Sequence, residues 1–255
     1  MTARRTSELA VGILPIALVL ALWQGIVASG TAPPVLLPAP GAVFARLIEQ
    51  AGKRQFLENA AITLYRLFAG FSIAVVVGVT LGVAATGNQT IEGIVKPLVR
   101  VLAPLPKVAL YPAMILILGF DDASKIALVA ADATFPILLA TWQGTAAVEP
   151  KLVWSARAAG TTPRAALFKI VLMAALPSVL TGCRIGLIIS CIVVFLAEMI
   201  TSTDGLGYLM IRAGRNFQTV DMFVPLISIS ILGLTLNAAF NALRKWLLQG
   251  YAEER

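Results

Sequence analysis

The apolar residues of this 255-residue chain gather in long runs, and three of these runs contain no charged residue at all. They cover residues 9–45, 67–91 and 222–243. Each run can supply the roughly 20 apolar residues that a helix needs to cross about 30 Å of hydrocarbon. The pattern therefore predicts an integral membrane protein built from α-helices.

Three further apolar runs, at 108–120, 126–144 and 183–200, are interrupted by isolated polar residues. Polar residues inside a span are costly, and they usually serve packing or transport. Together the runs predict an all-α membrane protein with about six transmembrane helices in a single domain, residues 1–255. We place the spans at about 10–29, 61–86, 104–120, 124–145, 180–201 and 222–244.

Two local patterns refine this prediction. Residues 92–112 contain four prolines, which a straight helix does not tolerate, so we expect a short surface helix, a break and then the third span. The second span has a small residue at every fourth position, which allows a neighbouring helix to approach closely. The sequence leaves open whether that helix belongs to the same chain or to a second subunit. The small residues are Gly70, Ala74, Gly78, Gly82 and Thr86.

Charge sets the orientation and excludes one class of partner. With both termini in the cytoplasm, 13 Lys and Arg residues lie on the inner side and 7 on the outer side, as the positive-inside rule requires. The net charge of +7 is explained by this asymmetry, so it indicates no nucleic-acid partner.

An enzyme is a poor match to the sequence. The chain has no histidine, no phosphate-binding loop, no nucleophile elbow and no cluster of metal ligands. Cys183 and Cys191 lie about 12 Å apart along one predicted helix, too far to form a disulfide, and we interpret them as core residues. Uphill transport driven by ATP would require another chain to bind the nucleotide, and we expect no cofactor or metal on this one.

Four polar residues inside the predicted spans are candidates for lining a translocation pathway. Glu198 shares a helical face with the small residues of the fifth span, so we expect it to point into the bundle. The alternative is that the four residues form hydrogen bonds between helices, or that Glu198 is the counter-ion of a basic residue. The candidates are Asp132, Glu198, Asn237 and Asn241.

The segment 149–186 is basic although it lies between apolar runs. Pro150 suits the first turn of a helix, and Gly160 suits the left-handed position at a helix end. Thr162 and Pro163 are typical of the N-cap and first residue of the next helix. The segment predicts a short exposed helix at about 150–160, a tight turn and a longer helix that enters the bilayer. Such a capped helix would be presented to a soluble partner.

From Trp154 to Pro177 the segment resembles the cytoplasmic loop of ABC importer permeases. The motif of that loop is E-A-A, three residues, Gly, nine residues and Ile-x-Leu-Pro. Aligned on Gly160, Trp154 stands at the glutamate position and Ile170 at the isoleucine. Further stretches, among them LLPAPGAVFARL, TLYRLFAGFSIAVVVGVTLG and LAEMITSTDGLGYLM, are similar to the aliphatic sulfonate, taurine and nitrate permease branch. The resemblance covers nearly the whole chain.

This resemblance implies the type I (MetI-like) ABC importer permease fold in the bacterial inner membrane. It implies a homodimer, two cytoplasmic ATPase subunits that bind ATP and Mg, and an extracytoplasmic binding protein that delivers a small anionic solute such as a sulfonate, taurine or nitrate. Transport would proceed by alternating access. The helix at 150–160 would be the coupling helix, with contacts to the ATPase through Val153, Trp154, Ser155, Ala156, Arg157 and Gly160.

The residues by themselves allow a second class of protein, a self-sufficient secondary transporter or channel. Asp132 and Glu198 would then be members of a proton relay. Uptake by this chain alone, driven by an ion gradient, would distinguish the two classes.

Overall fold

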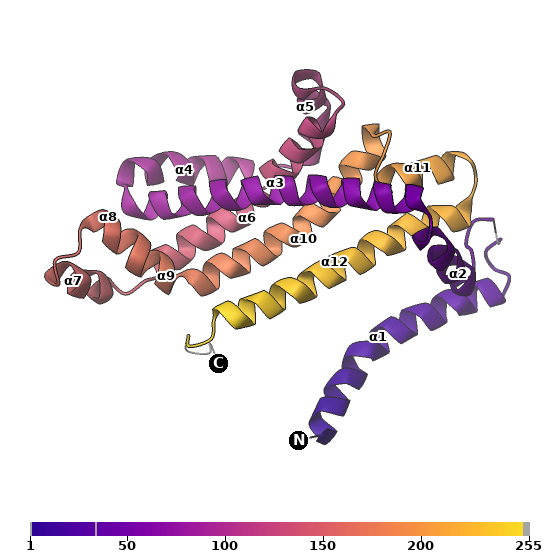
Figure 1. Cartoon of the computed structure of the whole chain (residues 1–255), viewed down its shortest axis with the longest axis horizontal. Coiled ribbons are helices and arrows are strands. Elements are labelled where there is room, and N and C mark those ends of the chain that lie inside the picture. The colour runs from indigo at the N-terminus through magenta and orange to yellow at the C-terminus, as the bar shows by residue number, and fades with distance from the viewer. Residues whose placement is uncertain (1, 34, 252–255) are drawn as a thin grey trace.

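The computed structural model describes the backbone of residues 2–33 and 35–251, and the side chains from residue 14 onward within those ranges. The described residues form an elongated helical bundle and contain no strand (Figure 1). In chain order the helices are α1 (Thr2–Ala28), α2 (Pro40–Ala51), α3 (Arg54–Gly87), α4 (Gln89–Leu102), η1 (Lys107–Leu110), α5 (Tyr111–Leu118), α6 (Asp122–Ala146), α7 (Pro150–Ala158), α8 (Pro163–Ala166), η2 (Leu167–Val171), α9 (Leu172–Ala174), α10 (Leu176–Thr201), α11 (Leu206–Arg215) and α12 (Thr219–Leu247).

Four of these helices are long and apolar enough to cross a membrane: α3, α6, α10 and α12. Each of them encloses one of the spans expected from the sequence. The first expected span falls on α1, whose apolar part within the described side chains is Leu14–Ala28. Within the described part of the chain there are thus four membrane-length helices, or five when α4 and the helix after it are counted as one bent span.

The third expected span, 104–120, is shorter than a full crossing. Its helix covers Lys107–Leu118, about 18 Å at about 1.5 Å per residue, and it is bent by 90° from α4. Pro104 and Pro106 lie in the break, where their missing N–H groups cannot continue a helix. Gly119, at φ +85°, ends α5. The prolines therefore predict the break correctly, but the helix after the break is too short to be a membrane-length third span by itself.

The central helix of the bundle is α6, which packs between α3 and α10. A Cβ atom added to Gly70, Gly78 or Gly82 of α3 would lie only 2.6 to 2.9 Å from side chains of α6. Gly182 and Gly186 of α10 approach α6 from the other side in the same way. The small-residue stripe of the second span thus packs inside the chain, which decides between the two alternatives left by the sequence.

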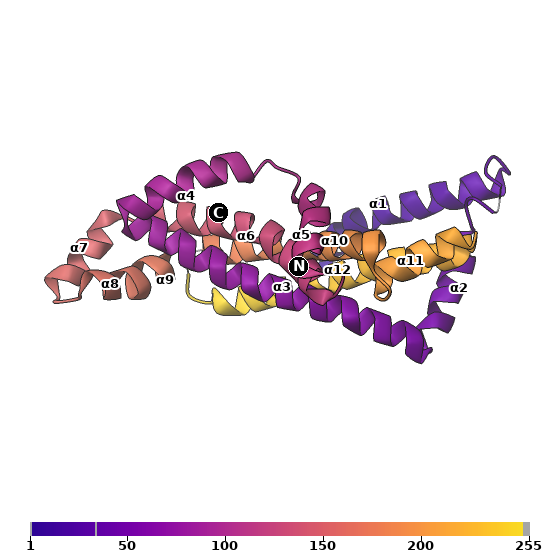
Figure 2. The ribbon, with the colours of Figure 1, turned by 90° about the horizontal axis from the view of Figure 1, so that it is seen from above.

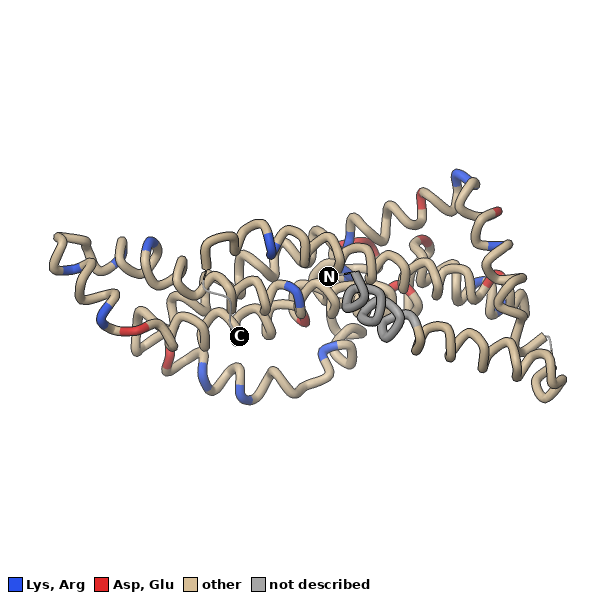
Figure 3. The backbone as a smooth tube through the Cα atoms, turned by 90° about the horizontal axis from the view of Figure 1, so that it is seen from below, with Lys and Arg blue, Asp and Glu red and all other residues tan. Residues whose placement is uncertain are grey.

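The elements at the two ends of the bundle differ. Helices α7 and α8 lie at one end of the long axis, and α2 and α11 lie at the other (Figures 1 and 2). Basic positions follow one another along the segment from α7 to η2 (Figure 3). These are Lys151, Arg157, Arg164 and Lys169.

Candidate functional site

The short helix α7 lies at one end of the long axis of the bundle (Figure 2). None of its residues is buried, and Trp154 is 65% exposed. Leu152 is exposed as well. Exposed aromatic and aliphatic side chains on one helix are typical of a docking surface for another protein.

Both ends of α7 are fixed by local sequence. Pro150 occupies the first turn. At the other end Gly160 has φ +86°, its N–H donates to the carbonyl of Arg157 at 3.0 Å, and the N–H of Thr161 donates to the carbonyl of Ala156 at 3.0 Å. These two hydrogen bonds form a Schellman motif, which needs a left-handed residue at its centre. The capping pattern expected from the sequence is confirmed.

The helix is joined to the membrane span α10 through α8, η2 and α9. The hydroxyl of Thr162 accepts a hydrogen bond from the N–H of Ala165 at 3.3 Å and caps α8. In η2 the N–H of Leu172 bonds the carbonyl of Leu167, a wider turn than in an α-helix. The expected longer helix is therefore present, but it is interrupted before α10 begins.

This connecting segment is held by two distant parts of the chain. The side chain of Leu167 packs so closely on Gly87, at the end of α3, that a Cβ there would lie 2.8 Å from it. The Tyr251 hydroxyl donates to the carbonyl of Met173 at 2.8 Å. The segment between α7 and α10 is thus anchored to the bundle at two points.

The six residues expected to form the ATPase contact divide by exposure. Trp154, Ser155, Arg157 and Gly160 are exposed, whereas Val153 and Ala156 are half-buried. Val153 and Ala156 are three residues apart and share one face of the helix. The exposed residues are therefore available to a partner, and the half-buried pair faces the chain itself.

The polar residues expected in the spans have specific partners. Glu198 is 1% exposed and pairs with Arg66, itself 2% exposed, at 2.9 Å between Oε1 and Nη1. Arg66 also contacts Asp122 at 2.6 Å and Asp204. The Thr63 hydroxyl donates to Glu198 Oε2 at 2.9 Å. We call Thr63, Arg66, Asp122, Glu198 and Asp204 the Arg66 cluster.

The Arg66 cluster also holds the first turn of α11. The N–H groups of Gly205, Leu206 and Gly207 donate in turn to Asn59 Oδ1 at 2.6 Å, to the Thr63 hydroxyl at 2.9 Å and to Glu198 Oε2 at 3.0 Å. A carboxylate is stabilised at a helix N-terminus, where backbone N–H groups lack partners. Glu198 is consequently saturated by partners of the same chain. The geometry favours the counter-ion alternative for this residue.

Asp132 lies in a similar ion pair, 3.3 Å from Lys107 Nζ. Lys107 is 7% exposed, and its ammonium lies 4.4 Å from the ring centre of Phe135. The same ammonium lies 3.4 Å from the carbonyls of Ala103 and Leu105 in the break after α4. Asp132 thus ties the break to α6, which also favours the interhelical alternative.

The two asparagines lie on α12, which buries only Val224 and Pro225 within the chain. Asn237 Oδ1 accepts a hydrogen bond from Arg184 Nε at 2.9 Å. Asn237 also lines a mostly apolar groove of about 530 Å³ between α10 and α12. Asn241, one turn further, is half-buried. Of the four candidates, Asn237 is the one that lines this groove.

The sequence does not single out Arg66, although it is the hub of the buried cluster. By position it counts as one of the outer basic residues, and nothing local predicts that it is buried. The available signal was a lone arginine before an uncharged run and a lone glutamate in another span, but they are 132 positions apart. No group of three His, Cys, Asp or Glu suited to a metal ion occurs among the described residues.

The fold and these residues define a multi-pass helical membrane protein with an exposed loop helix. The sequence of residues 74–253 matches the model of the binding-protein-dependent transport system inner membrane component family. The chain belongs to this family, whose members are ABC importer permeases of the inner membrane, and the resemblance noted in the sequence is confirmed. Membership makes it a transport component rather than an enzyme.

Two relatives are similar over nearly the whole chain. The putative aliphatic sulfonates transport permease protein SsuC of Bacillus subtilis is 30% identical over 93% of this chain and 86% of its own length. The taurine transport system permease protein TauC of Escherichia coli is 28% identical over 98% of this chain and 92% of its own length.

Solved structures support the fold. A chain of the MetNI methionine ABC transporter, in an inward-facing conformation, superposes with a TM-score of 0.67 at 20% identity. The match covers 76% of this chain and 96% of that chain. An amino acid ABC transporter chain gives a TM-score of 0.57 at 17% identity, over 76% of this chain and 93% of that chain. The type I importer permease fold expected from the sequence is confirmed.

Proposed function

We propose that this permease is the membrane subunit of an ATP-driven importer and that α7 is the helix that docks on its ATPase. The observation that carries the proposal is the geometry of α7: none of its residues is buried, it begins at Pro150, it ends in a Schellman motif, and it is linked to α10. A helix that transmits force must keep its shape under load, and the caps at Pro150 and Gly160 serve that need. Trp154 takes the central anchoring position that large aromatic side chains often occupy at interfaces.

The ATP and Mg would be bound by the partner ATPase, because the sequence of this chain has no nucleotide-binding motif. We propose two ATPase subunits and two copies of the permease, so that each α7 has one ATPase to contact. Closure of the ATPase pair on ATP would bring the two α7 helices together. The movement would reach α10 through the anchored segment and would open the pathway to the outside, which is alternating access by rigid-body rotation.

For the solute we propose a small anion such as an aliphatic sulfonate, taurine or nitrate. The support is that the relatives named for aliphatic sulfonates and taurine align over almost the full chain. An extracytoplasmic binding protein would deliver the solute. Asn237 and Asn241 are the residues that we place on the pathway, because Asn237 lines the open groove. Asp132 and Glu198 serve as ion-pair partners in this proposal.

The orientation follows from the same proposal. If α7 meets a cytoplasmic ATPase, the end of the bundle that holds α7 is cytoplasmic and the end that holds α2 and α11 is extracytoplasmic. The excess of Lys and Arg on the α7 side agrees with this assignment. Both chain termini would then be cytoplasmic.

The docking role of α7 is tested with Trp154→Glu, which removes the aromatic anchor and adds a charge. We expect the variant permease to fold and reach the membrane, but to lose most of the co-purifying ATPase and its stimulation. Trp246→Glu is the matched control, since Trp246 is also 65% exposed but lies on α12. Full ATPase recovery and stimulation with Trp154→Glu would refute the proposal.

The rival function, a self-sufficient transporter or channel, is tested with the permease alone in proteoliposomes. We expect no uptake of radiolabelled taurine under an ion gradient, and uptake only after the ATPase, ATP and the binding protein are supplied. Uptake by the chain alone would favour the rival.

A further inference from the structure

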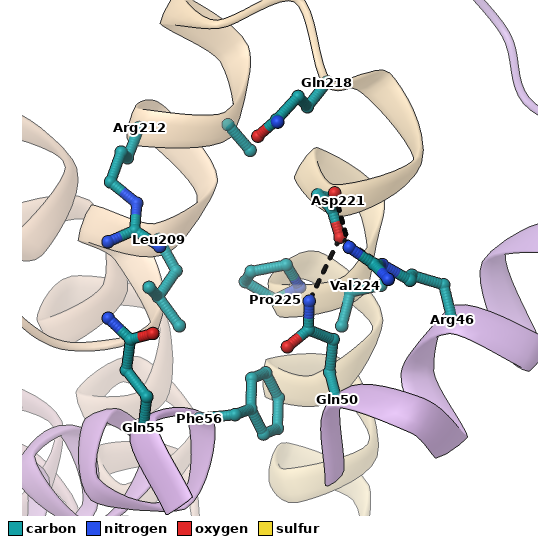
Figure 4. Close-up of a pocket in the computed structure, with 11 residues that line it drawn as sticks. Arg46, Gln50, Gln55, Phe56, Leu209, Arg212, Gln218, Asp221, Val224 and Pro225 are labelled. Carbon is teal, nitrogen blue, oxygen red and sulfur yellow. Dashed lines mark hydrogen bonds and ion pairs between the residues drawn. The ribbon is translucent and has the colours of Figure 1, made fainter. Parts of the chain in front are cut away.

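A polar pocket of about 160 Å³ lies at the end of the bundle opposite α7. It is enclosed by α2, the first turns of α3 and α12, and α11 (Figure 4). None of the four pathway candidates lines it. It is therefore a polar location distinct from the groove between α10 and α12.

One wall of the pocket is an ion-pair network that is internally balanced. Arg46 donates to Asp221 through Nε at 2.6 Å and through Nη2 at 3.2 Å, and to Glu49 at 2.6 Å. Gln50 Nε2 donates to Asp221 Oδ1 at 3.2 Å, and Lys53 pairs with Glu49 at 2.7 Å. Hydrogen bonds to Asp221 and Glu49 raise the pKa of Arg46, so its charge persists at any working pH. Two cations and two carboxylates cancel, and this wall ties α2 to α12.

The opposite wall carries a cation without a counter-ion. Arg212 of α11 is an exposed residue with no carboxylate within 4.0 Å among the described residues, and its guanidinium carbon lies 5.7 Å from the ring centre of Tyr208. Figure 4 shows the side chains of Arg212 and Gln55 next to each other on this wall, with Gln218 reaching in from the loop before α12. Within the described chain these three side chains form no hydrogen bond. They offer a guanidinium and two amide donors to the pocket.

The floor of the pocket is apolar, formed by Phe56, Leu209, Val224 and Pro225. A guanidinium with amide donors above an apolar floor suits a ligand with an oxyanion at one end and a short alkyl part at the other. The volume corresponds to about five water molecules, which is enough for a ligand of that size.

We infer that this pocket binds one oxyanion group of the sulfonate or phosphate type, with Arg212 as the charged anchor. Two sources supply that chemistry at this end of the bundle: the incoming solute and the phosphate headgroup of a lipid. The solute alternative rests on the proposed function and would make the pocket an entry site where an anion is held before it enters the pathway.

The test uses the permease–ATPase complex in nanodiscs, with the permease carrying the substitution Gln55→Cys. The thiol is labelled with anionic sulfonatoethyl methanethiosulfonate and, in parallel, with the cationic trimethylammonioethyl reagent. We expect the ratio of anionic to cationic labelling rates to fall by about tenfold when Arg212→Gln is added, because a charge-assisted contact is lost. Arg212→Lys should retain most of the ratio.

Two matched controls separate the pocket from the general surface field. Arg215→Gln removes the same charge from the same helix, but Arg215 does not line this pocket, and the ratio at Gln55→Cys should stay unchanged. Leu57→Cys places an exposed thiol on α3 outside the pocket, where Arg212→Gln should have no effect. The wild-type chain, whose Cys183 and Cys191 are buried, gives the background.

Competition identifies the source of the oxyanion. If ethanesulfonate slows the labelling of the cysteine in Gln55→Cys in phosphatidylcholine nanodiscs, the ligand is of the solute type. Protection that requires phosphatidylglycerol in the nanodisc and resists ethanesulfonate supports a lipid headgroup. Equal effects of Arg212→Gln and Arg215→Gln, with protection by neither compound, would overturn the inference.

ATP-driven sulfonate uptake by the complete importer is measured separately. Uptake without any protection at Gln55→Cys would refute the pocket and leave the proposed function intact. If ethanesulfonate protects the cysteine from labelling but the complex imports no sulfonate, the pocket is supported and the proposed function is refuted.

Discussion

The α7 segment and the Arg66 cluster use polar residues in opposite ways. At α7 no residue is buried, and Trp154 is 65% exposed. In the cluster Arg66 and Glu198 are buried to 2% and 1% exposure and bonded to several partners of the same chain. A surface that leaves its binding capacity unused is suited to a partner, whereas a saturated interior cluster holds helices together. The comparison predicts that changes at α7 alter coupling and that changes in the cluster alter stability.

The largest effect is expected for Arg66→Met. It leaves Glu198 buried without its cation, which should lower the free energy of unfolding by about 3–5 kcal/mol. Thermal unfolding in detergent, followed by size-exclusion chromatography, measures the loss. The double variant with Glu198→Leu removes both buried charges and should recover part of the stability. An unchanged melting temperature for Arg66→Met would show that the cluster does not stabilise the bundle.

A smaller effect is expected for Gly78→Ala, which tests the close packing of α3 on α6. The added methyl would lie 2.9 Å from Ile137 Cβ, so the cost should be about 1–3 kcal/mol. Gly233→Ala on α12 meets nothing within 4 Å and should be neutral or slightly stabilising, because alanine favours helix by about 1 kcal/mol over glycine. Equal melting temperatures for the two variants would contradict the close packing of α3 on α6.

The smallest effect on stability is expected for Gly160→Ala, which lies in the α7 segment. A left-handed alanine costs about 1–2 kcal/mol, and the strain falls on the exposed end of α7. We expect faster hydrogen exchange at the Thr161 amide and weaker ATPase stimulation, with little change in melting temperature. Gly30→Ala introduces similar strain at φ +69° in another part of the chain and should leave both readouts unchanged. Unchanged exchange at Thr161 in Gly160→Ala would argue against the capped geometry.

The same contrast explains how much the sequence could predict. The ends of α7 depend on Pro150 and Gly160, and the start of α8 depends on Thr162. Each of these residues acts on its own neighbours, so local rules predicted them. Glu198 was correctly expected to face the bundle, because a helical face is a local property. Its partner Arg66 lies 132 positions away, and only the packing of α3 against α10 brings them together.

The third expected span, 104–120, also shows what the sequence alone could not predict. The prolines predicted a break, but the angle of 90° and the length of the next helix depend on long-range contacts. One of these is the pairing of Lys107 with Asp132 on α6. The sequence shows that both residues are present, but it does not show that they lie close together in the fold.

The central claim, that α7 contacts the ATPase, is tested most directly by photo-cross-linking. A photoreactive phenylalanine analogue is placed at Trp154 or, as the control, at Trp246, and the purified permease is illuminated with its purified ATPase. We predict a covalent adduct with the ATPase from position 154 and none from position 246. No adduct from position 154 in a complex that still hydrolyses ATP would contradict the account.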